Sequence, residues 1–149
     1  MNIQWIVLDV DGVLSDGTLI YTSTGEELKA FSVKDGLGLT APRKSGIKLA
    51  IITARVSPMV ERRAKELHFD ELLMGHANKT EVLRALCKKH QIDLASVAYM
   101  GDDLNDLGAL QLVGLPMAPN NAVLEVKSIA KFISTVNGGH GAVREAVEY

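Results

Sequence analysis

Short apolar runs that end in polar residues, with amphipathic stretches between them, restrict the fold of this chain more than any other feature. The runs that we expect to be buried strands are Ile3–Leu8, Ile47–Ile52, Glu71–Met74, Val97–Met100 and Lys131–Ser134. The stretches with helical spacing between them are Pro58–Leu67 and Thr80–His90. Strands that alternate with helices predict a Rossmann-like α/β fold, in which helices cover both faces of a mostly parallel sheet.

One segment departs from this alternation. Residues Thr18–Val33 hold two β-rich runs around a turn at Thr22–Gly25, which predicts a small β-hairpin flap of about residues 17–33 after the first strand. No repeat or linker is visible elsewhere. With 149 residues, 47% of them hydrophobic and 23% charged, the chain is expected to form a single globular domain over residues 1–149.

Charge and composition exclude several classes of partner. The chain has 16 basic and 18 acidic side chains, a formal net charge of −2, so it has no basic excess to attract nucleic acid or an anionic membrane. Its apolar runs are far shorter than the ~18–20 residues that cross a bilayer, and its first residues do not resemble a signal peptide. Cys87 is the only cysteine, which rules out an internal disulfide. We therefore expect a cytoplasmic protein with neither nucleic acid nor membrane as its partner.

Carboxylates follow two of the predicted strands. Asp9 and Asp11 end the first strand, and the segment Gly101–Asp106 ends a later one. Taken singly, an Asx-type turn explains the first group and an acidic helix N-cap the second. If both strands are central and parallel, however, Asp9, Asp11 and Asp102 meet at the sheet edge where ligands bind. Two such charges ~4 Å apart repel by about 4 kcal/mol at an effective dielectric of about 20. A cation is therefore expected among them, and ligands that offer only oxygen favour Mg²⁺ bound together with a phosphate.

Two further polar residues fit a magnesium–phosphate site. Thr53 directly follows an apolar run, where its hydroxyl and the next amides can bind phosphate oxygens. Lys79 precedes a predicted helix, where its ammonium can offset the charge of phosphate and carboxylates. Taken singly, Thr53 is explained as a helix cap and Lys79 as a solvated surface lysine. The order of the four motifs favours a phosphoryl-transfer site instead.

This ordered set (DxD, Thr, Lys, GDDxxD) resembles the haloacid dehalogenase superfamily of phosphotransferases over nearly the whole chain. The resemblance implies that Asp9 is a nucleophile that forms an aspartyl-phosphate, and that Asp11 is the general acid and base. It further implies that Thr53 and Lys79 hold the phosphoryl group. The Mg²⁺ ligands implied are Asp9, Asp11 (through its backbone carbonyl) and Asp102. The residues implied to support this site are Asp103, Asn105 and Asp106.

The spacing of the motifs leaves no room for a separate cap domain between them. The hairpin is then the only cover that the chain supplies, and we expect a neighbouring subunit to complete it. Three further stretches, Gly25–Phe31, Val33–Gly36 and Gly138–Glu145, resemble the capless 3-deoxy-D-manno-octulosonate 8-phosphate phosphatases. This resemblance implies a homotetramer and, as the small-molecule partner, a sugar-acid phosphate of lipopolysaccharide precursor synthesis.

Two arginines bear on the substrate. Arg55 stands at a position where the octulosonate enzymes resemble this chain in having Arg. The related nonulosonate 9-phosphate phosphatases, which are the alternative function for this chain, tend to have Glu there. A guanidinium suits a sugar-acid carboxylate, and we expect Ala54, which replaces the family's usual glycine, to line the same site. Arg63 resembles an arginine offered to the substrate of an adjacent subunit. A solvated helix charge is the alternative explanation for both arginines. His140 departs from the family by replacing Arg in its GGRG stretch.

Two functions of another class compete with this interpretation. A phospho-receiver module also combines carboxylates, Thr and Lys on an α/β fold. It carries its phosphorylated Asp on the third strand, whereas Leu72–Gly75 contains none. A non-catalytic assembly domain would be expected to lack the nucleophile or a metal ligand, and both are present. Phosphate release that depends on Mg²⁺ would separate the enzyme from both alternatives.

Overall fold

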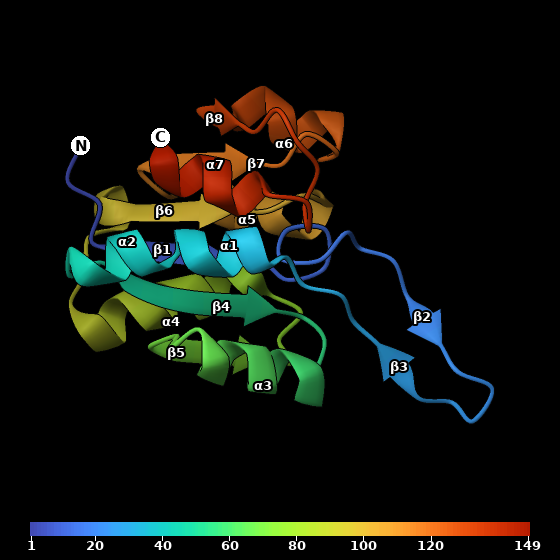
Figure 1. Ribbon diagram of the computed structural model, residues 1–149. Helices are drawn as coiled ribbons and strands as arrows, with labels where there is room; N and C mark the ends of the chain where they lie inside the picture. Colours follow the sequence, from blue (N-terminus) through green and yellow to red (C-terminus); the bar gives the residue numbers. More distant parts are fainter.

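The computed structural model describes residues 1–149, and six of its strands form one sheet in the order β5–β4–β1–β6–β7–β8 (Figure 1). These strands are β1 (Trp5–Leu8), β4 (Lys48–Thr53), β5 (Glu71–Met74), β6 (Val97–Met100), β7 (Leu115–Ala118) and β8 (Phe132–Ile133). Every pair in the sheet is parallel, and Leu8 at the end of β1 lies opposite Met100 at the end of β6. The residues that follow these two central strands therefore leave the sheet side by side.

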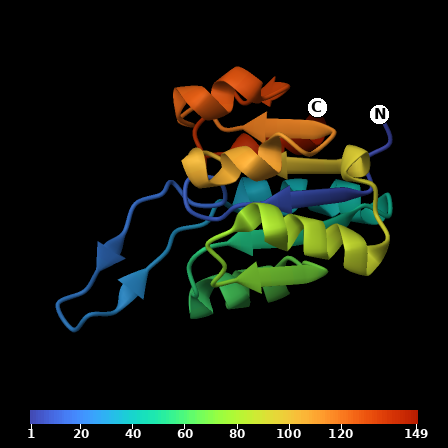
Figure 2. The same ribbon diagram turned by 180° about the vertical axis from the view of Figure 1, so that it is seen from behind.

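Helices cover both faces of the sheet, as the sequence predicted (Figures 1 and 2). They are α1 (Val33–Gly38), α2 (Thr40–Lys44), α3 (Pro58–Glu66), α4 (Lys79–His90), α5 (Leu107–Leu110), α6 (Leu124–Ile129) and α7 (Ala142–Glu148), with 3₁₀ turns at Leu94–Ser96 and Leu104–Asp106. Successive β1 residues point to opposite faces, so Val7 packs with α4, α5 and α6 while Leu8 packs with α3 and α7. Burial on both faces explains why the central strands are uninterrupted apolar runs. None of the helices combines the length and the apolar character that crossing a bilayer requires.

The predicted hairpin is present and projects from the carboxyl edge of the sheet (Figure 1). Its strands β2 (Ile20–Tyr21) and β3 (Glu27–Leu28) pair antiparallel. The apolar side chains of Leu19, Ile20, Tyr21 and Leu28 are 44–59% exposed. The hairpin thus offers an apolar surface that the rest of the chain leaves uncovered, and no cap domain accompanies it.

The helices α1, α2, α6 and α7 and the strand β7 were absent from our sequence prediction. Gly36 and Gly38 concealed α1 and Pro116 concealed β7, because these residues ordinarily interrupt helices and strands. The two glycines of α1 allow other side chains to pack closely against this helix. A Cβ on Gly36 would lie 2.6 Å from the Arg63 side chain, and a Cβ on Gly38 would lie 2.8 Å from the Arg144 side chain. Tertiary contact therefore outweighs helix propensity in this segment.

Candidate active site

The carboxyl ends of β1 and β6 bring the predicted acidic residues together, as the sequence interpretation required. Oxygens of Asp9, Asp102 and Asp106 all lie within 4.8 Å of one another. An open pocket of about 270 Å³ adjoins them. The residues that line it are Asp9, Asp11, Gly17, Thr53, Ala54, Arg55, Lys79, Asp102, Asp103 and Asn105. Of the predicted site residues, only Arg63 and Asp106 do not line this pocket.

Lys79 starts α4, and its side chain is only 1% exposed. Its Nζ lies 2.9 Å from Asp9 Oδ1 and 2.9 Å from Asp106 Oδ1. Burial lowers the pKa of Lys79, but the two carboxylates outweigh burial and hold that pKa above its ordinary value. The sequence could place Lys79 at a helix start without showing this burial, and the structure makes it a fixed positive charge beside Asp9.

Asp106 is fully buried, and both of its carboxylate oxygens are occupied. Oδ1 accepts hydrogen bonds from Lys79 Nζ and, at 2.8 Å, from the Tyr99 hydroxyl. Oδ2 accepts the backbone N–H groups of Asp102 at 3.0 Å and Asp103 at 3.3 Å. Although Asp106 lies close to the other two acids, its lone pairs are committed to these donors. It therefore anchors Lys79 and the backbone that carries Asp102 rather than offering an oxygen to a cation. Tyr99 belongs to this arrangement and was missed, because the sequence marks it only as a buried strand residue.

Asp9 and Asp102 carry a surplus of buried negative charge. Burial, with the Asp106 charge, raises the pKa of Asp9 to about 6, even though Lys79 opposes the shift. Burial, with the charges of Asp9 and Asp106, raises the pKa of Asp102 to about 8. A divalent cation would relieve both the repulsion and the desolvation, and the donors are all oxygen, which a hard cation prefers. These residues therefore fit a magnesium-type ion.

Glycines shape the loop that carries Asp9 and Asp11. Gly12 has a φ of +86°, and a Cβ there would lie 1.9 Å from Asp102 Oδ2, so only glycine permits this approach. A Cβ on Gly138 would lie 1.8 Å from the Gly12 carbonyl oxygen, and Gly139 donates its N–H to Val13 O at 3.0 Å. The segment before α7 therefore supports the loop from behind. His140 in that segment is exposed and does not line the pocket.

Thr53 and Arg55 reach the pocket from the carboxyl end of β4. Thr53 is 3% exposed. Arg55 donates a hydrogen bond to Glu27 Oε2 in the hairpin at 3.1 Å. A hydrogen bond with the Tyr21 side chain, followed by the Glu27 charge, raises the pKa of Arg55 further. The arginine is therefore at the predicted place, where it already has an acidic partner that the sequence did not reveal.

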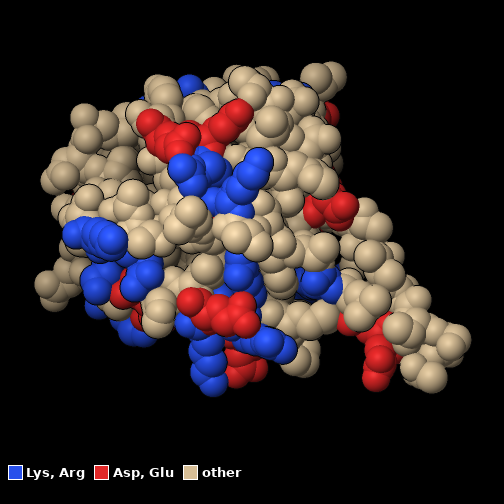
Figure 3. All heavy atoms as spheres, viewed as in Figure 1, with Lys and Arg blue, Asp and Glu red and all other residues tan.

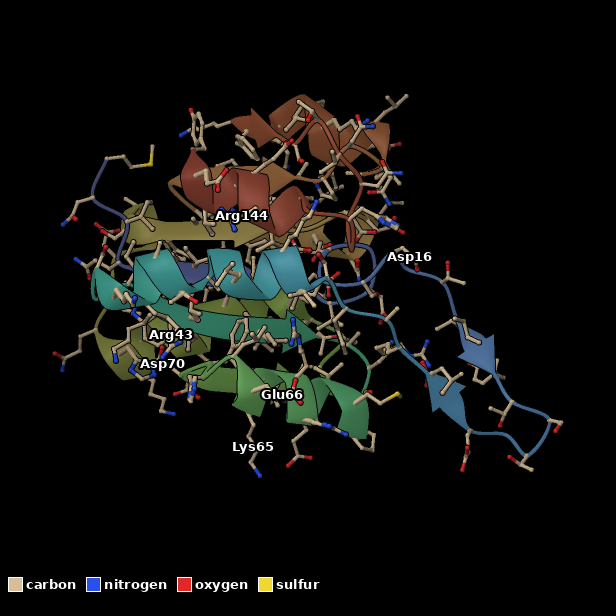
Figure 4. The ribbon with its side chains drawn as sticks, viewed as in Figure 1. Asp16, Arg43, Lys65, Glu66, Asp70 and Arg144 are labelled. Atoms are coloured by element: carbon tan, nitrogen blue, oxygen red, sulfur yellow. The ribbon has the colours of Figure 1, made fainter.

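Arg63 lies on α3, away from the pocket. Its guanidinium donates to the Ser32 carbonyl oxygen at 3.1 Å, lies 3.4 Å from Glu66 Oε2 and lies 5.8 Å from the centre of the Phe31 ring. Within the chain this arginine fastens the returning arm of the hairpin to α3, whose Glu66 is labelled in Figure 4. Its contact with the substrate of an adjacent subunit stays a prediction.

Lys29 is a residue of the site that sequence reasoning missed. It follows β3, its side chain is 2% exposed, and its Nζ lies 2.6 Å from Asp11 Oδ1 and 3.4 Å from Glu27 Oε1. The stretch Gly25–Phe31 had been used only for the family resemblance. The usable signal was a lysine two residues after a pair of glutamates, in a flap that follows the acidic end of the first strand.

Comparison with known proteins decides the family. Residues 70–146 match the family model of haloacid dehalogenase-like hydrolases. A 3-deoxy-D-manno-octulosonate 8-phosphate phosphatase of Escherichia coli strain K12 is 42% identical over 147 residues, which cover 99% of this chain and 78% of the relative. The chain belongs to the haloacid dehalogenase-like hydrolases. The prediction of the superfamily from its ordered motifs is confirmed.

Solved structures place this haloacid dehalogenase-like hydrolase more narrowly. A 3-deoxy-D-manno-octulosonate 8-phosphate phosphatase from Moraxella catarrhalis, solved with magnesium, phosphate and KDO, has a TM-score of 0.96 at 49% identity and covers 98% of this chain and 84% of its own. The cobalt-bound phosphatase of Haemophilus influenzae has a TM-score of 0.94 at 35% identity, with coverage of 99% and 86%. The predicted Rossmann-like fold and the prediction of an enzyme, a phosphatase, are confirmed.

Proposed function

We propose that this phosphatase hydrolyses 3-deoxy-D-manno-octulosonate 8-phosphate with Mg²⁺, through an aspartyl-phosphate on Asp9. The observation that carries the proposal is the Asp9 carboxylate, which is buried at the pocket beside Lys79 and Asp102. A solved phosphatase with the same fold contains magnesium, phosphate and KDO, which supports it. A nonulosonate 9-phosphate is the alternative substrate, and the presence of Arg55 rather than Glu favours the octulosonate.

Each residue of the pocket has a distinct part in the proposed reaction. Asp9 Oδ1 is held by Lys79 and, at 2.7 Å, by the Val10 N–H. The Asp9 carboxylate attacks phosphorus while the bond from phosphorus to the sugar oxygen breaks. Asp11 gives its proton to that oxygen, and later takes a proton from the water that cleaves the aspartyl-phosphate. Thr53 and Lys79 hold the phosphoryl oxygens throughout.

The residues that would hold a metal ion follow the two central strands. The carboxylates of Asp9 and Asp102 and, as the family resemblance implies, the backbone carbonyl of Asp11 would hold Mg²⁺. When bound, the ion neutralises charge on the phosphoryl group as it is transferred. Asp103 and Asn105 line the same edge, and Asp103 accepts the Leu104 N–H at 2.7 Å, which stiffens the turn after Asp102.

A phosphate-release assay tests the proposed function. Purified protein is expected to release phosphate from 3-deoxy-D-manno-octulosonate 8-phosphate with Mg²⁺ and to lose this activity in EDTA. Mg²⁺ is also expected to raise the Tm of the wild type, because an ion that binds only the folded state stabilises it, and to do so far less in Asp102→Asn. A receiver module or an assembly domain would release no phosphate, and such a result would reject the enzyme.

Arg55→Ala tests the recognition of the acidic sugar. If Arg55 binds the sugar carboxylate, the variant is expected to lose roughly tenfold in kcat/KM for sugar-acid phosphates, in the range of a charged hydrogen bond. It is expected to change little for glucose 6-phosphate, which has no carboxylate. The exposed Arg62 of α3 supplies the control variant Arg62→Ala. An equal loss for acidic and neutral sugars would dismiss the carboxylate role.

We propose that residues 1–149 act as a single phosphatase domain within a homotetramer, with the hairpin of about residues 17–33 as the only cover that the chain itself supplies and a neighbouring subunit completing it. The exposed apolar side chains of the hairpin support assembly, because such a surface is stabilised by contact with a further subunit.

We place the enzyme in the cytoplasm, in lipopolysaccharide precursor synthesis. Its single free cysteine, Cys87, is compatible with a reducing compartment. On the face shown in Figure 3, acidic and basic side chains are interspersed, so this face has no extended basic surface of the kind that binds nucleic acid.

A further inference from the structure

A chain of alternating charges links the hairpin to the pocket. Asp11 pairs with Lys29, Lys29 approaches Glu27 and Glu27 pairs with Arg55. Asp11 and Arg55 line the pocket, whereas Glu27 and Lys29 come from the hairpin and do not. The reaction proposed above uses the two end members of this chain and leaves the two hairpin residues without a role.

Lys29 is buried against acidic acceptors at the base of the hairpin. A lysine at the base of an exposed flap can extend into water, yet the Lys29 side chain is 2% exposed. Taking an ammonium out of water is costly and is offset only by close acceptors. Its closest acceptor is Asp11 Oδ1 at 2.6 Å, whereas Glu27 Oε1 is 3.4 Å away. The lysine is therefore directed primarily at Asp11.

Asp11 has no other side-chain partner to fix it. Its side chain is 25% exposed, and Lys29 supplies its one hydrogen bond, so Oδ2 has none within the protein. Asp9, by contrast, is held by Lys79 and by the Val10 N–H. Each of the two carboxylates on the loop is thus held by a buried lysine, one from α4 and the other from the hairpin.

We infer that Lys29 is a positioning residue for Asp11: it holds Oδ1 so that Oδ2 is the oxygen that exchanges protons with the sugar oxygen and with water. Glu27 positions Lys29 and Arg55 together, which couples proton transfer and sugar recognition to one hairpin. The hairpin is then a working part of the site as well as its cover. This inference rests on the proposed function, because it requires Asp11 to be the acid and base.

The variants Lys29→Met and Lys29→Arg test the inference, with Lys34→Met as the control. Lys34 is an exposed lysine on α1, near the hairpin, that has no ion pair. For 3-deoxy-D-manno-octulosonate 8-phosphate, Lys29→Met is expected to lower kcat by about 10- to 100-fold, the cost of a small misplacement of a reacting group. KM is expected to change much less than kcat, because Lys29 contacts neither the residues assigned to phosphate nor Arg55, to which it is linked only through Glu27. Lys29→Arg should recover most of the activity, and Lys34→Met should match the wild type.

An activated substrate separates positioning from a general loss of structure. The leaving group of p-nitrophenyl phosphate needs no proton, so Lys29→Met is expected to give a burst of one nitrophenolate per site followed by slow turnover. In the Asp11→Asn background, adding Lys29→Met should cost less than about twofold, because residues that act through one group are not additive. Thermal unfolding checks that each variant is folded.

Three outcomes would overturn the inference. One is a wild-type kcat in Lys29→Met, and another is the same loss from Lys29→Met with and without Asp11. If either occurs while the wild type keeps its Mg²⁺-dependent and Asp9-dependent turnover, the proposed function stands and the role of Lys29 falls. Absence of Mg²⁺-dependent phosphate release from the wild type would remove both.

Discussion

Asp9→Asn is expected to lower turnover by at least about a thousandfold at saturating Mg²⁺ and substrate, because the amide cannot form the aspartyl-phosphate. The variant keeps nearly the same shape, so its far-ultraviolet circular dichroism should match that of the wild type. Lys79 still has Asp106 as a partner at 2.9 Å, and one of the charges that repel Asp102 is gone. We therefore expect a stable, inactive protein.

Labelled phosphate identifies the step that is lost. Substrate carrying ³²P should transfer label to the wild-type chain in a rapid acid quench and should leave Asp9→Asn unlabelled. Asp16→Asn is the matched control, since this exposed carboxylate lies where the hairpin leaves the loop and does not line the pocket (Figure 4). Equal labelling of Asp9→Asn and wild type would reject the nucleophile.

The part of the site that could be predicted from the sequence is the part that the sheet itself positions. Asp9, Thr53 and Asp102 directly follow or end parallel strands, so recognising the strands was enough to place them at one edge. Asp9 and Asp102 come together because β1 and β6 are neighbours in the sheet. The sequence could predict this meeting, because both motifs follow the carboxyl ends of parallel strands, where ligands bind. Local pattern and global fold agree at these positions.

The part that escaped prediction depends on contacts between elements that are remote in sequence. Lys29 reaches Asp11 only because the hairpin folds back towards the loop, and hairpin sequence alone does not say where its base will lie. Arg63 is predicted to reach the substrate of an adjacent subunit, and the sequence did not reveal its contacts with Ser32 and Phe31 within its own chain. Lys79 was placed correctly at the start of a helix, but its burial follows from the start of α4 lying beside the segments that carry Asp9 and Asp106.

Lys79→Met is expected to damage both stability and turnover, since the substitution keeps the length of the side chain and removes its charge. Lys79 and Asp106 are 1% and 0% exposed, so the variant leaves two buried carboxylates without their cation. Breaking a buried pair in this way costs about 3–5 kcal/mol, which corresponds to a decrease in Tm on the order of 10 °C for a domain of this size. Differential scanning calorimetry without metal measures the change. Lys88→Met, on the exposed face of the same helix, is the control and should leave Tm within about 2 °C of the wild type.

The double variant Lys79→Met/Asp106→Asn separates the two effects of this lysine. Neutralising Asp106 removes one of the uncompensated charges, so part of the lost stability should return. Turnover should not return, because the phosphoryl group still lacks its ammonium partner, and we expect a loss of roughly 100- to 1000-fold in kcat. Recovery of turnover together with stability would mean that Lys79 serves only the fold. Recovery of stability alone would show that the same buried charge holds Asp9 in place and stabilises the phosphoryl group during transfer.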